Sequence, residues 1–143
     1  SNTMARQKKM EMVVRGNAGG DAKEFTTGKG VKGASVNVAY NDSWFDKEQN
    51  KWIEGDVEWV SVFAYENSGS AFRDLSSVKK GDWIEAFGKP RASLGKSKEG
   101  EQIAQQILVA NEVLPLQKRE KSEGGNTNYD DYAPPNNMSD IPF

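Results

Sequence analysis

Three aromatic residues have the setting expected of side chains that bind a flat ligand: Trp44, Trp59 and Tyr65. Trp44 lies in a polar stretch close to Lys47, a position that suits a core tryptophan poorly. Trp59 and Tyr65 share one face of an alternating segment, because residues two apart in a strand point to the same side. Aromatic faces stack on unpaired nucleic-acid bases, at about 1–3 kcal/mol per base, while neighbouring cations hold the phosphates. This combination therefore indicates stacking chemistry on single-stranded nucleic acid.

Basic residues form small clusters near the ends of the expected elements. The candidates for phosphate contacts are Lys32, Lys79, Lys80, Lys89 and Arg91, besides Lys47. A basic pair alone is more often simply a solvated surface. Residues 4–117 hold 16 Lys or Arg and 16 Asp or Glu, so a positive field must come from local clustering and not from net charge.

The sequence contains no histidine and no cysteine. Ser-His-Asp and Cys-His nucleophiles and zinc-bound water each need one of these groups. No acidic cluster has the spacing of a metal site or an acid–base pair. We therefore expect no enzyme, no catalytic residue, no metal and no cofactor. The absence of cysteine, of a signal peptide and of a long apolar run predicts a cytoplasmic protein that does not insert into membranes.

Alternating apolar residues predict five strands, which cover residues 8–15, 34–40, 57–65, 82–87 and 102–114, with a short extended piece at 23–27. In the third strand we expect Val60, Val62 and Ala64 to point into a barrel and Trp59 to point outward. The alternative places Trp59 and Phe63 in the core. Residues 16–21, 41–56 and 92–100 are expected to be loops.

One helix is expected at residues 68–78, with Ser68 as its cap. Five strands with a helix between the third and the fourth are typical of an all-β OB-fold, a Greek-key barrel whose outer face binds oligonucleotides. Another small β-barrel or a sandwich is the alternative. Residues 28–33 match G-x-G-x-x-G, but a strand pattern follows where a dinucleotide site needs a helix, so we expect a hairpin turn. Trp52 and Trp83 are expected to be packing residues.

Three regions follow from the change of composition along the chain. Residues 4–117 form the predicted domain, residues 118–137 a flexible linker without apolar periodicity, and residues 138–143 a tip that is apolar again. In the tip, Pro142 restricts the backbone, Phe143 offers an aromatic anchor, and Asp140 adds charge beside Ile141. This predicts a peptide that docks on partner proteins.

Five short motifs occur in order along the sequence. They are Gly16-Asn17-Ala18-Gly19-Gly20-Asp21, Ser43-Trp44-Phe45-Asp46-Lys47, Val57-Glu58-Trp59-Val60, Lys80-Gly81-Asp82 and the final Asp140-Ile141-Pro142-Phe143. Together they resemble the bacterial-type single-stranded DNA-binding protein (SSB) family, over residues 10–143. A phage- or plasmid-encoded or otherwise divergent member would fit the departures, among them Glu11 and Leu94-Gly95 at positions where the family has a basic and an aromatic residue.

The resemblance implies that Trp44 and Trp59 stack on bases, that Tyr65 replaces a stacking phenylalanine, and that Lys47 and Lys80 contact phosphates. It also implies a nucleoid-associated homotetramer that binds and protects single-stranded DNA without sequence preference. The tip would recruit replication, repair and recombination proteins. Two other functions stay open: an RNA-directed OB-fold module or primosome accessory protein, and an adaptor that mainly binds other proteins.

Overall fold

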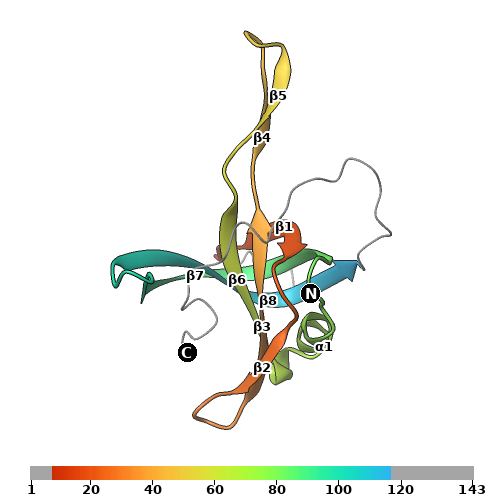
Figure 1. Cartoon of the computed structure of the whole chain (residues 1–143). Coiled ribbons are helices and arrows are strands. Elements are labelled where there is room, and N and C mark those ends of the chain that lie inside the picture. Colours follow the sequence, from red (N-terminus) through yellow and green to blue (C-terminus); the bar gives the residue numbers. More distant parts are fainter. Residues whose placement is uncertain (1–7, 117–143) are drawn as a thin grey trace.

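The computed structural model describes residues 8–116 of the chain (Figure 1). Its elements follow one another as β1 (Met12–Ala18), β2 (Lys23–Thr26), β3 (Lys32–Tyr40), β4 (Ser43–Asp46), β5 (Lys51–Glu54), β6 (Glu58–Tyr65), the 3-10 turn η2 (Glu66–Ser68), α1 (Ser70–Ser76), β7 (Trp83–Lys96) and β8 (Gln102–Leu116). The five predicted strands are all present. Three of them (β3, β7 and β8) are longer than expected, and β1 runs on to Ala18, into the segment predicted as a loop. The extended piece predicted at 23–27 is β2, and two further short strands, β4 and β5, accompany them.

Five of the strands close into a barrel. β1 pairs with β3, β3 with β6, β6 with β8, β8 with β7, and β7 returns to β1. The β6–β8 pair is parallel and the other pairs are antiparallel. This closed Greek-key ring, with α1 between its third and fourth strands, is the OB-fold that the sequence predicts.

The inward faces of the strands form one apolar core. Val60, Val62 and Ala64 point into it from β6, as predicted, and Leu75 closes it from α1. The other main contributors are Val14, Val36, Val38, Ile84, Ala86, Leu108 and Val113. Inward and outward residues alternate along a strand. The residues that fill the core therefore determine which side chains of the same strands point outward.

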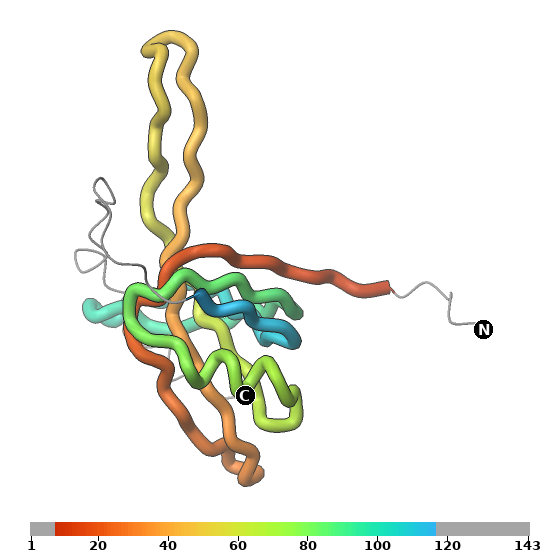
Figure 2. Tube along the Cα trace, turned by 90° about the vertical axis from the view of Figure 1, so that its right-hand side faces the viewer, coloured from red at the N-terminus to blue at the C-terminus, as the bar shows by residue number. Residues whose placement is uncertain are grey.

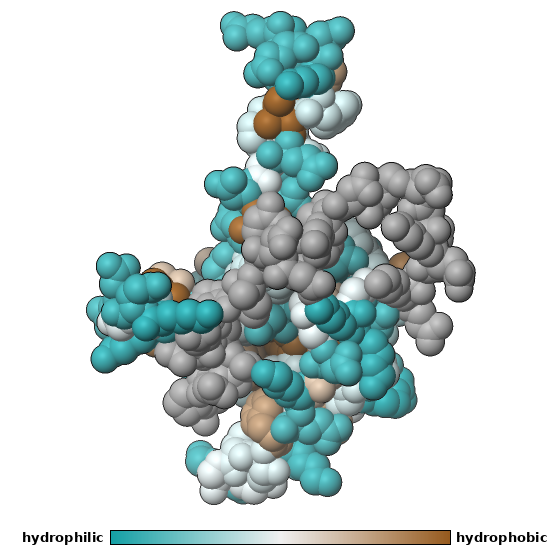
Figure 3. Space-filling view, in the orientation of Figure 1, coloured by the Kyte–Doolittle hydropathy of each residue, from teal (hydrophilic) through white to brown (hydrophobic). Residues whose placement is uncertain are grey.

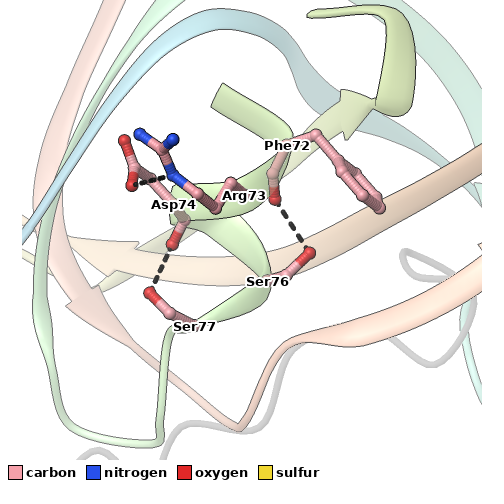
Figure 4. Close-up of polar contacts among 5 residues, drawn as sticks. All are labelled: Phe72, Arg73, Asp74, Ser76 and Ser77. Atoms are coloured by element: carbon pink, nitrogen blue, oxygen red, sulfur yellow. Dashed lines mark hydrogen bonds and ion pairs between the residues drawn. The ribbon is translucent and has the colours of Figure 1, made fainter. Parts of the chain in front are cut away.

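The helix is shorter than predicted and begins differently. α1 covers Ser70–Ser76, and its N-cap is Gly69, with φ 60° and no side-chain cap, so the prediction of Ser68 as cap is wrong. Ser68 instead ends the preceding 3-10 turn. At the other end, the hydroxyl of Ser76 donates to the carbonyl oxygen of Phe72 (2.8 Å) and that of Ser77 to the carbonyl oxygen of Asp74 (2.7 Å; Figure 4).

Two hairpins project from the barrel where the sequence predicts loops (Figures 1 and 2). We call residues 41–58 the β4–β5 arm and residues 89–106 the β7–β8 arm. In the first, β4 and β5 pair by themselves as a two-stranded sheet. In the second, β7 and β8 stay paired as far as Lys96 and Gln102. Both faces of each arm are largely exposed, so the hydrophobic alternation that marks a half-buried strand is missing from their sequences.

The third hairpin confirms the interpretation of the glycine-rich motif. β2 and β3 are joined by a tight turn in which Thr27 N–H donates to the carbonyl oxygen of Val31 (2.8 Å). Gly30 has φ 85°, a backbone region that glycine enters without strain. No helix follows, so the motif has no phosphate-binding geometry of the dinucleotide type.

No helix within residues 8–116 is long and apolar enough to cross a membrane. Within the same residues, no group of three or more acidic side chains is arranged to hold a metal ion. The predicted linker at 118–137 and the predicted docking residues Asp140, Ile141, Pro142 and Phe143 lie outside the described residues.

Candidate nucleic-acid interface

One outer face of the barrel carries the predicted aromatic residues. On β6, Trp59 and Tyr65 lie opposite the inward valines, and Ser61 and Phe63 lie between them on the same outer side. Their partners across β3 are all small: Ala39, Asn37, Ser35 and Gly33. On this side Ser61 and Phe63 are buried, and the rings of Trp59 and Tyr65 are partly exposed. We call this outer side of β3, β6 and β8 the platform.

Trp59 is held in place by the turn between β1 and β2. Its ring lies against Gly19, where an added Cβ would stand 2.5 Å from ring atom Cζ3. Gly19 is fixed in turn, since its N–H donates to the carbonyl oxygen of Asn37 (2.8 Å). The alternative that places Trp59 and Phe63 in the core is wrong for Trp59, whose ring is partly buried on the outer side against a glycine, although Phe63 is buried (1% exposed) on that same side.

Two of the family-like motifs contact each other. The carboxylate of Asp21 accepts a hydrogen bond from the N–H of Lys80 (2.9 Å), and Asn17 Nδ2 donates to the carbonyl oxygen of Gly81 (3.2 Å). Gly81 N–H also donates to the carbonyl oxygen of Ala18 (2.9 Å). The turn that supports Trp59 is therefore bonded directly to the loop that carries Lys79 and Lys80.

Tyr65 is framed by a residue that the sequence analysis missed. Phe25 of β2 makes edge contacts with Tyr65 (6.0 Å between ring centroids) and with Phe63 (5.8 Å). Its ring covers Gly33: a Cβ added to this glycine would stand 2.5 Å from Phe25 Cζ. The alternation of residues 23–27 with a glycine opposite the aromatic position is the signal that could have identified it.

Arg91 reaches the neighbourhood of Tyr65. Burial raises the pKa of the Tyr65 phenol, and the positive charge of Arg91 opposes that rise. The phenol is therefore neutral near pH 7 and adds no negative charge that would repel a phosphate.

Lys89 and Arg91 belong to the same side of the barrel as the platform. Lys89 pairs with Val109 and Arg91 with Ile107, and these two β8 residues pair with Phe63 and Ser61. Residues paired across strands point to the same face, so both cations lie about two strand spacings, or roughly 10 Å, from the β6 aromatics.

A small hollow lies beside the turn that supports Trp59. The Ser61 hydroxyl donates to Asn37 Oδ1 (2.7 Å), which orients this amide on the platform. Beside it lies a cavity of about 140 Å³ lined by Gly19, Gly20, Asp21, Lys23, Ser35, Val36 and Asn37.

The remaining predicted residues lie away from the platform. Trp44 (50% exposed) and Lys47 are on the β4–β5 arm, where the Trp44 ring leans on Gly55. Lys32 lies on the side of β3 opposite Gly33, and its N–H donates to Glu66 Oε2 (2.8 Å). The structure thus gathers Trp59, Tyr65, Lys89 and Arg91 on one side, with Lys79 and Lys80 at its edge.

The prediction that Trp52 and Trp83 are packing residues is wrong. Trp52 is 68% exposed and touches Phe45 across the β4–β5 arm, with 5.7 Å between the ring centroids. Trp83 is 37% exposed on the outer side of β7, where its Nε1 donates to Glu85 (3.2 Å). The sequence predicts a strand at Trp83 but a loop at Trp52, and it shows the position of neither residue relative to the barrel.

Comparison with known proteins points to one family. No family model matches the chain. Single-stranded DNA-binding protein 2 of Tropheryma whipplei, from strains Twist and TW08/27, is 31% identical over 87 residues, which is 60% of this chain. The chain spans 57% of the length of these relatives.

Two solved structures share the fold. The small single-stranded DNA-binding protein from Streptomyces coelicolor superposes with a TM-score of 0.60 at 17% identity, over 75% of this chain and 94% of that one. The chain is similar to single-stranded DNA-binding proteins in sequence and in fold. An SSB from Plasmodium falciparum, in complex with single-stranded DNA, has a TM-score of 0.54 at 18% identity, over 81% of this chain and all of that one. The SSB fold thus agrees with the resemblance of the motifs.

Proposed function

We propose that the described domain binds single-stranded DNA without sequence preference, with bases stacked on the platform. The observation that supports this most directly is the juxtaposition of Trp59 and Tyr65 with Lys89 and Arg91 on one outer side of an OB barrel. Stacking tolerates any base because every base has a π-face, and the cations follow the phosphates. The domain's relatives carry this activity in their names.

The strand would enter near Lys79 and Lys80, cross Trp59 and continue over Tyr65 toward Arg91. The contacts of Asp21 with the Lys80 loop keep the entry point next to the Trp59 ring. Trp44 and Lys47 would bind a further stretch along the β4–β5 arm. Lys32, on the other side of β3, takes a secondary place in this path.

Oligo-dT should quench tryptophan fluorescence, because a base stacked on Trp59 or Trp44 alters the emission of the ring. The affinity should fall as salt rises, by about 0.7 of a log unit per tenfold salt for each phosphate contact. Titrations at several salt concentrations measure both effects, and oligo-U in parallel tests preference for DNA over RNA. A chain that shows neither quenching nor a change in oligo anisotropy at low salt would not be a single-strand binder.

A second outer face supports the proposal that the chain assembles as a homotetramer. On the β1–β7–β8 side, Val13, Leu114 and Leu116 are 42%, 46% and 58% exposed, beside Trp83 and Phe87. One ion pair crosses this face, between Arg15 and Glu85 (3.6 Å), and the Arg15 guanidinium lies over the Phe87 ring (5.8 Å). A sheet face this apolar is typical of a surface that another copy covers.

Leu114→Glu should break this assembly, because it places a carboxylate beside Glu85 in a face that association would bury. Light scattering should give a mass near four chains for the unaltered protein and one or two chains for the variant. Arg73→Gln, an exposed change on α1 away from this face, serves as the control. An unaltered protein that runs as a monomer would contradict the proposal.

The division of the chain into a domain (4–117), a linker (118–137) and a tip (138–143) also remains a proposal. Its support is compositional: charged and small residues fill the linker, and Ile141, Pro142 and Phe143 follow Asp140 in the tip. Such a peptide would recruit proteins of replication, recombination and repair without occupying the platform.

A further inference from the structure

The β4–β5 arm has two chemically different faces. In a two-stranded ribbon, successive cross-strand pairs point to opposite sides. The pairs Trp44–Ile53 and Asp46–Lys51 occupy one side. The pairs Phe45–Trp52 and Ser43–Glu54 occupy the other, which we call the aromatic face. Figure 3 shows an apolar patch part-way along this arm, below a hydrophilic tip.

The aromatic face is poorly suited to a nucleic-acid strand. Its one charged residue among these four is Glu54, and residues 41–58 as a whole contain six Asp or Glu and only two Lys. A strand stacked on Phe45 and Trp52 would bring its phosphates next to carboxylates. The opposite side also has one carboxylate, Asp46, but there it is paired with Lys51, so that side offers Trp44 a neighbouring cation that the aromatic face lacks. The two sides therefore call for different ligands.

The β7–β8 arm carries the complementary pattern. Leu94, which is 65% exposed, and Lys96 lie two residues apart on one side of β7. On β5, Trp52 and Glu54 are also two residues apart on one side, and Phe45 of β4 lies across from Trp52. Residues two apart in a strand are about 6.7 Å from each other. Leu94 could therefore pack against the Phe45–Trp52 rings of another arm while Lys96 lies near Glu54. The residues 89–106 hold four Lys or Arg and two acidic residues.

This side of the β7–β8 arm is not the one that faces the platform. Arg91 pairs with Ile107 on the platform side, and Leu94 lies on the opposite side because its position along β7 differs by an odd number of residues. Single-stranded DNA on the platform would leave the exposed Leu94 side of this arm uncovered.

The two arms of one chain project from the barrel in different directions (Figures 1 and 2), so they do not meet within one copy. We propose that the aromatic face of one copy docks on the Leu94–Lys96 side of the β7–β8 arm of a second copy. Leu94 would pack against the Phe45–Trp52 pair, and Lys96 would pair with Glu54.

Such a contact joins two different surfaces, and each copy keeps one of each free for the next neighbour. Contacts of this kind repeat into open arrays unless the rotation closes a ring. If the proposed DNA-binding function holds, neighbouring assemblies would line up along one strand and bind it cooperatively. The arm contact itself does not depend on DNA.

Sedimentation of the full chain at increasing concentration, without DNA, tests the contact. Glu54→Lys and Lys96→Glu should each weaken association beyond the basic assembly by about tenfold, because like charges then face each other. The double variant Glu54→Lys with Lys96→Glu should recover the association to within about threefold of the unaltered chain. Trp52→Ala should weaken it by about tenfold or more, since it removes the apolar contact. Trp44→Ala, on the other face, should leave it unchanged.

A double variant that associates no better than the single ones would overturn the proposal. So would a Trp52→Ala chain that associates normally but loses affinity for an oligo-dT long enough for one assembly only, because the aromatic face would then bind DNA. Binding of the unaltered chain to that short oligo-dT is measured separately, so failure of the proposed function would be distinguished from failure of the arm contact.

Discussion

Replacing Trp59 by alanine should weaken binding of single-stranded DNA by about 1–3 kcal/mol, or roughly 5- to 150-fold in Kd. The ring lies against Gly19 on the outer side of the barrel, and Val60 and Val62, which follow it in β6, fill the core. Its loss therefore removes a stacking surface and leaves the core intact. Anisotropy of a labelled oligo-dT gives the affinity, and circular dichroism during heating shows whether the fold is retained.

The graded variant Trp59→Phe keeps a smaller ring and should lose less affinity than alanine. Arg73→Ala is the charge control, because Arg73 is exposed on α1 and pairs with Asp74 (3.5 Å), away from the platform. Should Trp59→Ala unfold the protein and Trp59→Phe bind normally, the ring would have a structural role in place of a stacking one.

Leu75→Ala should have the largest effect on folding. Leu75 is fully buried, and α1 contacts β3, β6 and β8, so its side chain plugs one end of the barrel. Truncation of a buried leucine leaves a cavity and costs about 2–5 kcal/mol. Domains of this size are stable by about 5–15 kcal/mol, so the variant would lose a large share of its stability. Urea unfolding followed by circular dichroism measures the change.

Leu94→Ala is the matched control for stability, because the same side chain is 65% exposed at that position. It should alter the free energy of unfolding by no more than about 0.5 kcal/mol. Equal losses from the two variants would show that the end of the barrel relaxes around α1 and that the packing seen there contributes little.

The barrel could be predicted from sequence because its strands obey one simple rule. Val60, Val62 and Ala64 alternate with larger or polar residues, and a half-buried strand needs that pattern. The two arms could not, because strands exposed on both sides carry no such alternation: Lys51 and Glu54 in one arm read as loop residues. Cross-strand pairing and turn geometry hold these hairpins, and a single sequence shows neither.

The platform was only half predictable. Trp59 and Tyr65 could be placed on one side of a strand, because residues separated by an even number of positions share a face. Phe25 and Arg91 join them only through pairing across β2, β3, β8 and β7, which depends on register. Lys32 was predicted to contact phosphates, but it lies on the side of β3 that faces away from the platform. The sequence shows that a basic residue is near this strand but not which way it points.

The order in which the barrel closes has a consequence for how the chain folds. Met12 of β1 pairs with Gly88 of β7, and the parallel β6–β8 ladder joins Ser61 to Ile107, so the ring is completed by its last two strands. Contacts that distant in sequence must form against the entropy of closing long loops, which slows folding compared with helical domains of equal size. During synthesis, β1, β3 and β6 would wait as an open sheet until β7 and β8 leave the ribosome. That interval is when the bare edges of β1 and β6 are most exposed to pairing with another chain.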